Sequence, residues 1–298
     1  MTLSDADISP ESRYGLKRLA VRDSEMAYIE TGQGAPIVFI HGNPTSSFLW
    51  RNVIPHVEDL GRCLAPDLIG MGDSGTMPSG TYRYQEQADY LDAWFDGVAA
   101  AEDVILVLHD WGGALGYSRA ARFPEQIAGI AYMETMVRPR RWSDLPDGRD
   151  KIFKKFRSAE GERMVMEDNF FVETMMFEMG IVRDLSEVEK EVYRAPYREK
   201  ARRFVTLQWP REIPFDGDPA DNAEVVQRYS DFLARSDLPK LFVNTTQGHA
   251  LTGPPREFCR TWPNQTEVTI DARHFLQEDK PHELGRALRA FVQTVREG

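Results

Sequence analysis

Residues 104–116 read VILVLHDWGGALG, and they contain the sharpest structural signal in the chain. The run VILVL is entirely apolar, as expected of a strand buried on both faces. The segment WGGALGYSRAARF that follows has a helical pattern. Asp110 therefore lies on a sharp turn between a buried strand and a helix, where a nucleophile is presented in some enzymes. Such a turn favours small residues two positions on either side; Gly112 fits this pattern and Leu108 does not.

The same alternation of strand and helix extends in both directions from this segment. Alternating strands and helices indicate crossover connections and a parallel sheet. Helices are predicted at 46–57, 83–100, 111–123, 221–235, 255–262 and from 281. Strands are predicted at 17–23, 24–31, 35–42, 61–70 (followed by a loop), 103–109, 126–134, 240–245 and 265–270.

The alternation stops between residues 136 and 217, where helices and loops rich in Phe, Met, Trp and charged residues are expected. The chain is therefore predicted to be an α/β protein with a mostly parallel, doubly wound, eight-stranded sheet. Residues 1–135 and 218–298 are assigned to this main domain. Residues 136–217, called the cap segment below, are assigned to a helical domain inserted into it.

Composition excludes several classes of partner. The 298 residues carry a net charge of −11, which disfavours nucleic acid and anionic membranes as partners. Arg138, Arg140 and Arg141 form a local basic cluster that is expected to be solvated. Cys63 and Cys259 are too far apart for a metal-binding motif and are expected to be reduced and structural. The first residues lack an apolar run, so a cytoplasmic protein without a signal peptide is expected.

Polar residues follow several of the predicted strands. His41-Gly42-Asn43-Pro44, His109-Asp110-Trp111, Glu134 and Arg273-His274-Phe275 each come directly after a strand or close to its end. Because ligands of open parallel sheets bind beyond the carboxyl ends of the strands, these segments are expected to converge on one rim.

Asp110 at the turn indicates a particular chemistry. A carboxylate is already ionised at neutral pH and can attack a saturated carbon that bears a good leaving group, forming an ester. Hydrolysis of that ester needs a general base, for which His274 is the candidate. The base needs an acid to orient it. No Asp or Glu follows Lys240 in KLFVNTTQGHALTGPP, so Glu134 is the predicted partner.

The segments HGNPTSS (41–47), HDWGGALG (109–116) and HFLQED (274–279) together resemble those of the haloalkane dehalogenases, which have the α/β-hydrolase fold. The resemblance runs through almost the whole chain and implies hydrolysis of a haloalkane by water to alcohol, halide and a proton. It implies that the side-chain N–H groups of Asn43 and Trp111 bind the halide and that their backbone N–H groups form the oxyanion hole. No metal or organic cofactor is implied.

The resemblance also implies that the cap segment covers an apolar substrate pocket. His41 and His109 are expected to be structural, and packing in the core competes with pocket lining for the Met175, Met176 and Met179 group. The predicted pocket residues are Leu145, Phe153, Phe171, Met175, Met179, Trp209, Pro210, Ile213, His249, Ala250 and Phe275.

Three other functions remain open from the sequence. An epoxide hydrolase also uses an Asp at the turn and a His base, and it needs cap tyrosines, for which Tyr193 and Tyr197 are candidates. A coelenterazine-luciferase-like oxygenase is very similar in sequence to these dehalogenases. An α/β-hydrolase that only binds a ligand is disfavoured by the predicted Asp110, His274 and Glu134 triad.

Overall fold

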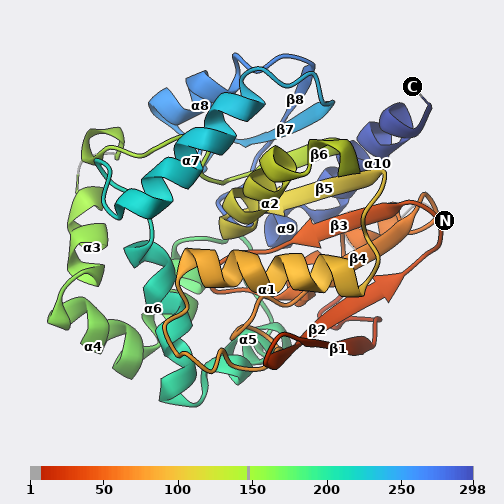
Figure 1. Ribbon diagram of the computed structural model, residues 1–298. Helices are drawn as coiled ribbons and strands as arrows, with labels where there is room; N and C mark the ends of the chain where they lie inside the picture. Colours follow the sequence, from red (N-terminus) through yellow and green to blue (C-terminus); the bar gives the residue numbers. More distant parts are fainter. Residues whose placement is uncertain (1–7, 146–147, 298) are drawn as a thin grey trace.

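The computed structural model describes residues 8–145 and 148–297, which form one eight-stranded sheet covered by helices (Figure 1). The strand order is β1-β2-β4-β3-β5-β6-β7-β8. The strands are β1 (Leu16–Val21), β2 (Ser24–Thr31), β3 (Pro36–Ile40), β4 (Arg62–Pro66), β5 (Val104–His109), β6 (Ile127–Met133), β7 (Lys240–Thr245) and β8 (Gln265–Ile270).

Only the pairings of β1 with β2 and of β2 with β4 are antiparallel; the remaining pairings are parallel. Every residue of β3, β5 and β7 is buried. Burial on both faces explains why β3 and β5 are almost continuous apolar runs in the sequence. The register pairs Ile40 with Leu108 and His109 with Met133, so the polar segments that follow these strands emerge at one edge. The predicted fold class is confirmed.

Helices cover both faces of the sheet, with α1, α2 and α7 on one side and α10 on the other (Figure 1). The apolar residues Leu284, Leu288 and Val292 of α10 are buried against the sheet side. The helices of this part of the chain are α1 (Tyr84–Gly97), α2 (Trp111–Arg122), α7 (Ala220–Leu233), α8 (Gly253–Cys259), α9 (Leu276–Asp279) and α10 (Pro281–Glu297).

The cap segment contributes helices and no strand among its described residues. They gather at the end of the sheet where the parallel strands finish (Figure 1). These are α3 (Arg149–Phe156), α4 (Ala159–Asp168), the π-helix η5 (Phe171–Glu178), α5 (Glu187–Arg194) and α6 (Phe204–Arg211). Phe156, Val165 and Leu207 form a small apolar core of their own within this group.

A buried ionic network joins the cap segment to the rest of the protein. Arg51 donates to both carboxylate oxygens of Glu278 on α9, at 2.6 and 2.9 Å, and to Glu189 on α5 at 2.6 Å. All three side chains are buried, and the partly buried Arg183 pairs with the same two carboxylates. Two arginines and two glutamates therefore compensate one another's charge. The network fixes α5 against α9, the short helix that begins just after His274.

The prediction of a helix over residues 46–57 is wrong. The segment forms two 3₁₀ turns instead, η1 (Ser47–Trp50) and η2 (Ile54–His56). Pro55 lacks an N–H group and its ring would clash with the preceding turn of an α-helix, so a continuous helix is disfavoured there.

Cys63 and Cys259 are both buried and free, as predicted. The described residues contain no helix that is both long and apolar enough to cross a membrane. The N-terminal stretch, for which no signal peptide is predicted, lies partly outside the described residues.

Candidate active site

Asp110 occupies the turn between β5 and α2 with a φ of 51°, a backbone conformation that residues other than glycine rarely adopt. The turn packs so closely on its neighbours that a Cβ atom on Gly112 would lie 2.1 Å from the carbonyl oxygen of Ile40. Leu108 is tolerated because Gly116, one turn into α2, leaves room for it: a Cβ atom there would meet the Leu108 side chain at 2.4 Å. The missing small residue before Asp110 is thus replaced by one on the helix.

Backbone amides hold the Asp110 carboxylate. The N–H of Asn43 donates to its Oδ1 at 2.7 Å, and the N–H of Trp111 also bonds to the carboxylate. A Cβ atom on Gly42 would lie 2.2 Å from Oδ1, so this approach requires glycine. Two backbone N–H groups therefore bond to the same carboxylate, and paired backbone donors of this kind can form an oxyanion hole.

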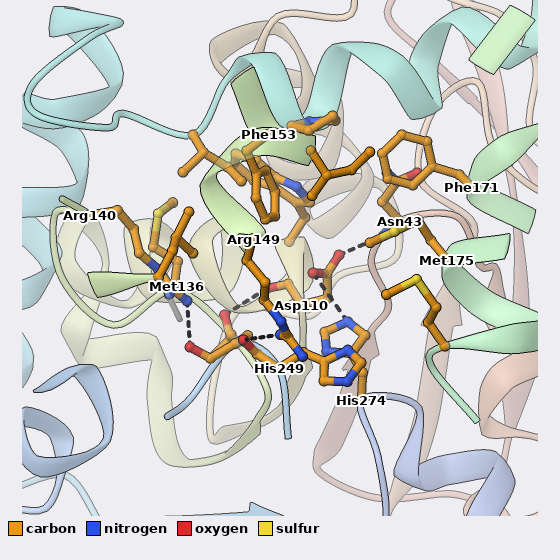
Figure 2. Close-up of a pocket in the computed structure, with 18 of the residues that line it drawn as sticks. Asn43, Asp110, Met136, Arg140, Arg149, Phe153, Phe171, Met175, His249 and His274 are labelled. Atoms are coloured by element: carbon orange, nitrogen blue, oxygen red, sulfur yellow. Dashed lines mark hydrogen bonds and ion pairs between the residues drawn. The ribbon is translucent and has the colours of Figure 1, made fainter. Parts of the chain in front are cut away.

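His274 lies between two carboxylates. Its Nδ1 is 3.0 Å from Glu134 Oε2. Its Nε2 faces Asp110 and lies 3.5 Å from Oδ2 (Figure 2). Three residues that are far apart in the sequence therefore form a line, with the imidazole in the middle. Residues at the ends of β5 and β6, together with the loop after β8, bring them together.

Glu134 is fully buried, and its charge is stabilised by the loop after β7. The N–H groups of His249 and Ala250 donate to Oε2 at 2.5 and 2.9 Å, and that of Leu251 donates to Oε1 at 3.2 Å. The sequence showed that this loop carries no acid. The sequence could not show that backbone N–H groups of this loop bind Glu134 at the end of the neighbouring strand. Every residue type except proline has such a group, so residue types do not reveal this contact.

These contacts shift the acidities of all three groups. Burial lowers the pKa of His274, but hydrogen bonds to Asp110 and Glu134 outweigh burial and raise that pKa to about 9. Burial disfavours ionised Glu134, yet the hydrogen bond and charge of His274 and the loop amides hold the pKa of this carboxyl far below its usual range. For Asp110 the contacts with His274 likewise outweigh burial and lower the pKa. Both carboxylates are therefore ionised at neutral pH.

His41 and His109 are buried and neutral, because burial lowers the pKa of His41 to about 4 and that of His109 to about 3. His41 accepts a hydrogen bond from the N–H of Leu68 at 2.9 Å. His109 Nε2 lies 2.9 Å from the carbonyl oxygen of His274 and so fixes the position of that segment. Both contacts fit the predicted structural role.

A cavity of about 390 Å³ lies above Asp110 and is bordered by Asn43, Trp111 and His274. The amide nitrogen of Asn43 donates one hydrogen bond to the carbonyl oxygen of Thr206 at 3.0 Å. An amide group has a second N–H that this bond does not use. The predicted pocket residues found on the wall are Leu145, Phe153, Phe171, Met175, Met179, Pro210, Ile213, His249, Ala250 and Phe275.

Trp209 is the predicted pocket residue that does not reach the cavity. Neighbouring residues of a helix point about 100° apart, so Pro210 faces the cavity while Trp209 faces away from it. Its indole packs against that of Trp111, with ring centroids 4.7 Å apart, and its Nε1 donates to Met71 Sδ at 3.3 Å. Trp209 thus supports Trp111 from behind. Met176 is fully buried in the core rather than on the cavity wall.

The sequence did not identify several residues of the wall, including Met136, Phe170, Phe215, Arg140 and Arg149. The expectation that Arg140 is solvated is wrong: only 9% of the residue is exposed, and its Nη2 donates to the carbonyl oxygen of Ala250 at 2.6 Å. The sequence did not indicate the burial of Arg140, because neighbouring arginines in one short segment can differ in exposure. Arg141 is exposed, as predicted.

The model of the alpha/beta hydrolase fold family matches residues 35–281. With its parallel sheet and the tight turn after β5, the chain is an α/β-hydrolase. It is 49% identical to a haloalkane dehalogenase of Sphingobium indicum over 94% of this chain and 96% of that protein. It is also 39% identical to the coelenterazine h 2-monooxygenase of Renilla reniformis, over 94% of this chain and 91% of that protein.

Among solved structures, haloalkane dehalogenase DbeA from Bradyrhizobium elkani USDA94 superposes with a TM-score of 0.90 at 42% identity, covering 95% of this chain and 99% of that one. The chain therefore belongs to the haloalkane dehalogenase family.

Proposed function

We propose that this enzyme hydrolyses haloalkanes through an ester on Asp110. The observation that carries the proposal is the line of Asp110, His274 and Glu134 beneath a largely apolar cavity, with Asn43 and Trp111 beside the nucleophile. An apolar cavity suits an alkyl chain and strengthens every charge interaction within it. In this proposal residues 136–217 act as the cap domain that encloses the substrate.

In the first step an oxygen of Asp110 attacks the carbon that bears the halogen. The carbon–oxygen bond forms as the carbon–halogen bond breaks, and the bonding pair leaves with the halide. N–H groups of the Trp111 indole and the Asn43 amide stabilise the departing anion. No proton moves in this step, so no base is required.

In the second step His274 takes a proton from water, and the resulting hydroxide attacks the carbonyl carbon of the ester. The backbone N–H groups of Asn43 and Trp111 stabilise the oxyanion that forms. The bond between the carbonyl carbon and the alkoxy oxygen then breaks. The departing oxygen takes the proton of the added hydroxyl group, which releases the alcohol and restores the Asp110 carboxylate. Glu134 stabilises the imidazolium, which loses its proton to solvent. Water is the only co-substrate, and no metal or organic cofactor takes part in the proposed reaction.

The cavity supports epoxide hydrolysis less well than haloalkane hydrolysis. Tyr193 and Tyr197, the candidate acids for an epoxide oxygen, are buried and neither borders the cavity. The hydroxyl of Tyr193 donates to Glu278 in the network that fixes α5. No tyrosine is found on the cavity wall among the described residues.

Release of bromide from 1-bromobutane and 1,2-dibromoethane tests the proposal directly. We expect turnover with both and none with Asp110→Ala. Hydrolysis of styrene oxide without bromide release would instead identify an epoxide hydrolase. Light emission with coelenterazine and no bromide release would identify an oxygenase like the Renilla relative.

Isotopic water separates the ester pathway from direct attack by water. In a single turnover in H₂¹⁸O, the product oxygen should come from Asp110 and remain ¹⁶O, while the label enters the Asp110 carboxylate. His274→Phe should accumulate the alkyl ester, seen as a mass increase on the peptide that contains Asp110. Label in the alcohol after one turnover would contradict the proposed nucleophile. A cytoplasmic location and the absence of nucleic-acid or membrane partners remain predictions from the sequence.

A further inference from the structure

Two arginines border the cavity, although an alkyl chain needs no charge there. Arg140 and Arg149 both lie on the wall. Each bonds only to a backbone carbonyl of the loop after β7, Arg140 to Ala250 at 2.6 Å and Arg149 to His249 at 3.4 Å. In the part of the chain that the structure describes, neither forms an ion pair with a carboxylate. The wall thus contains two cations whose counter-charges are not supplied by a direct partner.

Arg149 is the more available of the two. It is the first residue of α3 and only half-buried, and its side chain extends toward His249 at the edge of the cavity (Figure 2). A guanidinium has five N–H donors, and the single bond at 3.4 Å is long for a hydrogen bond. Most of its donors therefore remain available to a ligand.

A structural role alone does not account for this placement. The charge of Glu134 does favour a cation nearby, but Glu134 already bonds to His274 and to the backbone N–H groups of residues 249–251. The charge of Asp144 also acts on Arg140, but that carboxylate pairs with Arg138 at 2.9 Å, so the two charges offset each other. With His274 protonated, the cations Arg140, Arg149 and His274 outnumber the carboxylates of Asp110 and Glu134. This local surplus occurs in a protein whose net charge is −11.

An anionic group on the ligand would neutralise the excess positive charge at the cavity wall. A carboxylate binds a guanidinium through two parallel hydrogen bonds, a geometry that is both strong and specific. The rest of the ligand must be apolar, because most of the other wall residues, such as Ile152, Phe153 and Phe170, are apolar.

We propose that Arg149 binds the carboxylate of a substrate whose halogen lies at the opposite end of an alkyl chain, an ω-haloalkanoate. The inference rests on the proposed function. The reaction is otherwise unchanged: ω-bromoalkanoate and water give ω-hydroxyalkanoate, bromide and a proton. The carbon–bromine bond breaks at Asp110, while the carboxylate stays bound to Arg149 and takes no part in the chemistry.

The test compares 6-bromohexanoate with 6-bromohexanamide, which is similar in shape but neutral, and with 1-bromohexane. For the wild-type enzyme, kcat/KM should be higher for the carboxylate than for the amide. In Arg149→Gln the ratio of these two values should fall about tenfold, mainly through KM for the carboxylate. Arg149→Lys should keep part of the preference. Arg141→Gln, which alters an exposed arginine away from the cavity wall, should leave the ratio as in wild type.

Two results would overturn the inference while leaving the proposed function intact: bromide release from 1-bromohexane without preference for the carboxylate, or a preference that persists in Arg149→Gln. Bromide release from none of the three substrates would overturn the proposed function itself. Calorimetric binding of hexanoate, which has no halogen, measures the carboxylate site separately. It should weaken about tenfold in Arg149→Gln, and equal binding by both proteins would rule the site out.

Discussion

The backbone nitrogen of His249 lies 2.5 Å from Glu134 Oε2, and the same carboxylate oxygen lies 3.0 Å from His274 Nδ1. One oxygen thus accepts from a loop amide and from the imidazole. The loop after β7 therefore determines where Glu134 points, and through Glu134 it determines the orientation of His274. This relationship leads to the first two predictions.

Gly248→Ala should impair catalysis although residue 248 is not one of the residues that line the cavity. A Cβ atom there would lie 2.3 Å from Glu134 Oε1 and 2.3 Å from Thr245 Oγ1, so the carboxylate or the loop must move. A displacement of about 1 Å in a catalytic group is expected to lower kcat about 100-fold. Steady-state kinetics check this. Gly15→Ala is the matched control, because no atom lies within 4 Å of the added Cβ there, and its kcat should be unchanged.

Glu134→Gln should slow hydrolysis of the ester more than its formation. The new amide cannot stabilise the imidazolium, and its NH₂ group would face the N–H donors of His249 and Ala250. We expect kcat to fall at least about 100-fold, with ester accumulating on Asp110. Rapid-quench mass spectrometry measures both steps. Equal slowing of bromide release and alcohol release would assign Glu134 a different role.

The pKa of His274 should fall during the reaction. It is raised to about 9 partly by the negative charge of Asp110, and that charge disappears when Asp110 becomes an ester. Single-turnover hydrolysis of the preformed ester should therefore increase with pH with a midpoint below 9. A midpoint at or above 9 would show that Asp110 does not control the base. Alkylation thus generates the neutral form of the base that the next step needs.

The same shift has a consequence for stability. His274 has a pKa of about 9 in the folded protein and an ordinary pKa of 6.5, so its protonated form stabilises the folded state. This stabilisation is fully present below pH 6.5 and is lost as pH rises through 9. The stability of wild type relative to His274→Phe should therefore decrease over this range, by up to about 3 kcal/mol. Urea unfolding at several pH values tests this, and a difference independent of pH would contradict it.

Trp209→Ala should weaken halide binding although Trp209 does not line the cavity. Its indole supports Trp111, with ring centroids 4.7 Å apart, and it is fully buried. Truncation should cost about 3–5 kcal/mol of stability and allow Trp111 to move. Product inhibition by bromide, measured as an inhibition constant, should become several-fold weaker. Trp209→Phe keeps an aromatic ring against Trp111 and should retain most of the inhibition.

Glu278→Gln should destabilise the fold through Arg51. Arg51 and Arg183 would then share Glu189 as their carboxylate partner. The buried guanidinium of Arg51 would be undercompensated, which is expected to cost about 3–5 kcal/mol in urea unfolding. Glu187→Gln removes an exposed carboxylate of the same helix α5 as Glu189 and should change stability by less than about 1 kcal/mol. Similar effects of the two substitutions would indicate that the network is not closed to water.

The sequence predicted the elements that carry chemistry because parallel strands end at one edge. Asp110, Glu134 and His274 each follow a strand, so their convergence required only the correct fold. Contacts made by backbone atoms could not be predicted from the sequence, as the amide groups that bind Glu134 show. The orientation of Trp209 was missed because resemblance identifies a position and not the direction of its side chain. Arg140 was missed because a cluster of arginines normally indicates a solvated surface.

The loop of residues 248–251 binds Glu134 through N–H groups and accepts hydrogen bonds from Arg140 and Arg149 through carbonyl oxygens. On the loop side every one of these bonds uses a backbone atom, so none requires a particular side chain at 249 or 250. Mutation can therefore vary those two side chains, both of which face the cavity, and retune selectivity while the acid stays in position. In evolutionary terms, substitutions at 249 and 250 can change substrate preference with little loss of catalytic activity, provided that residue 248 remains glycine.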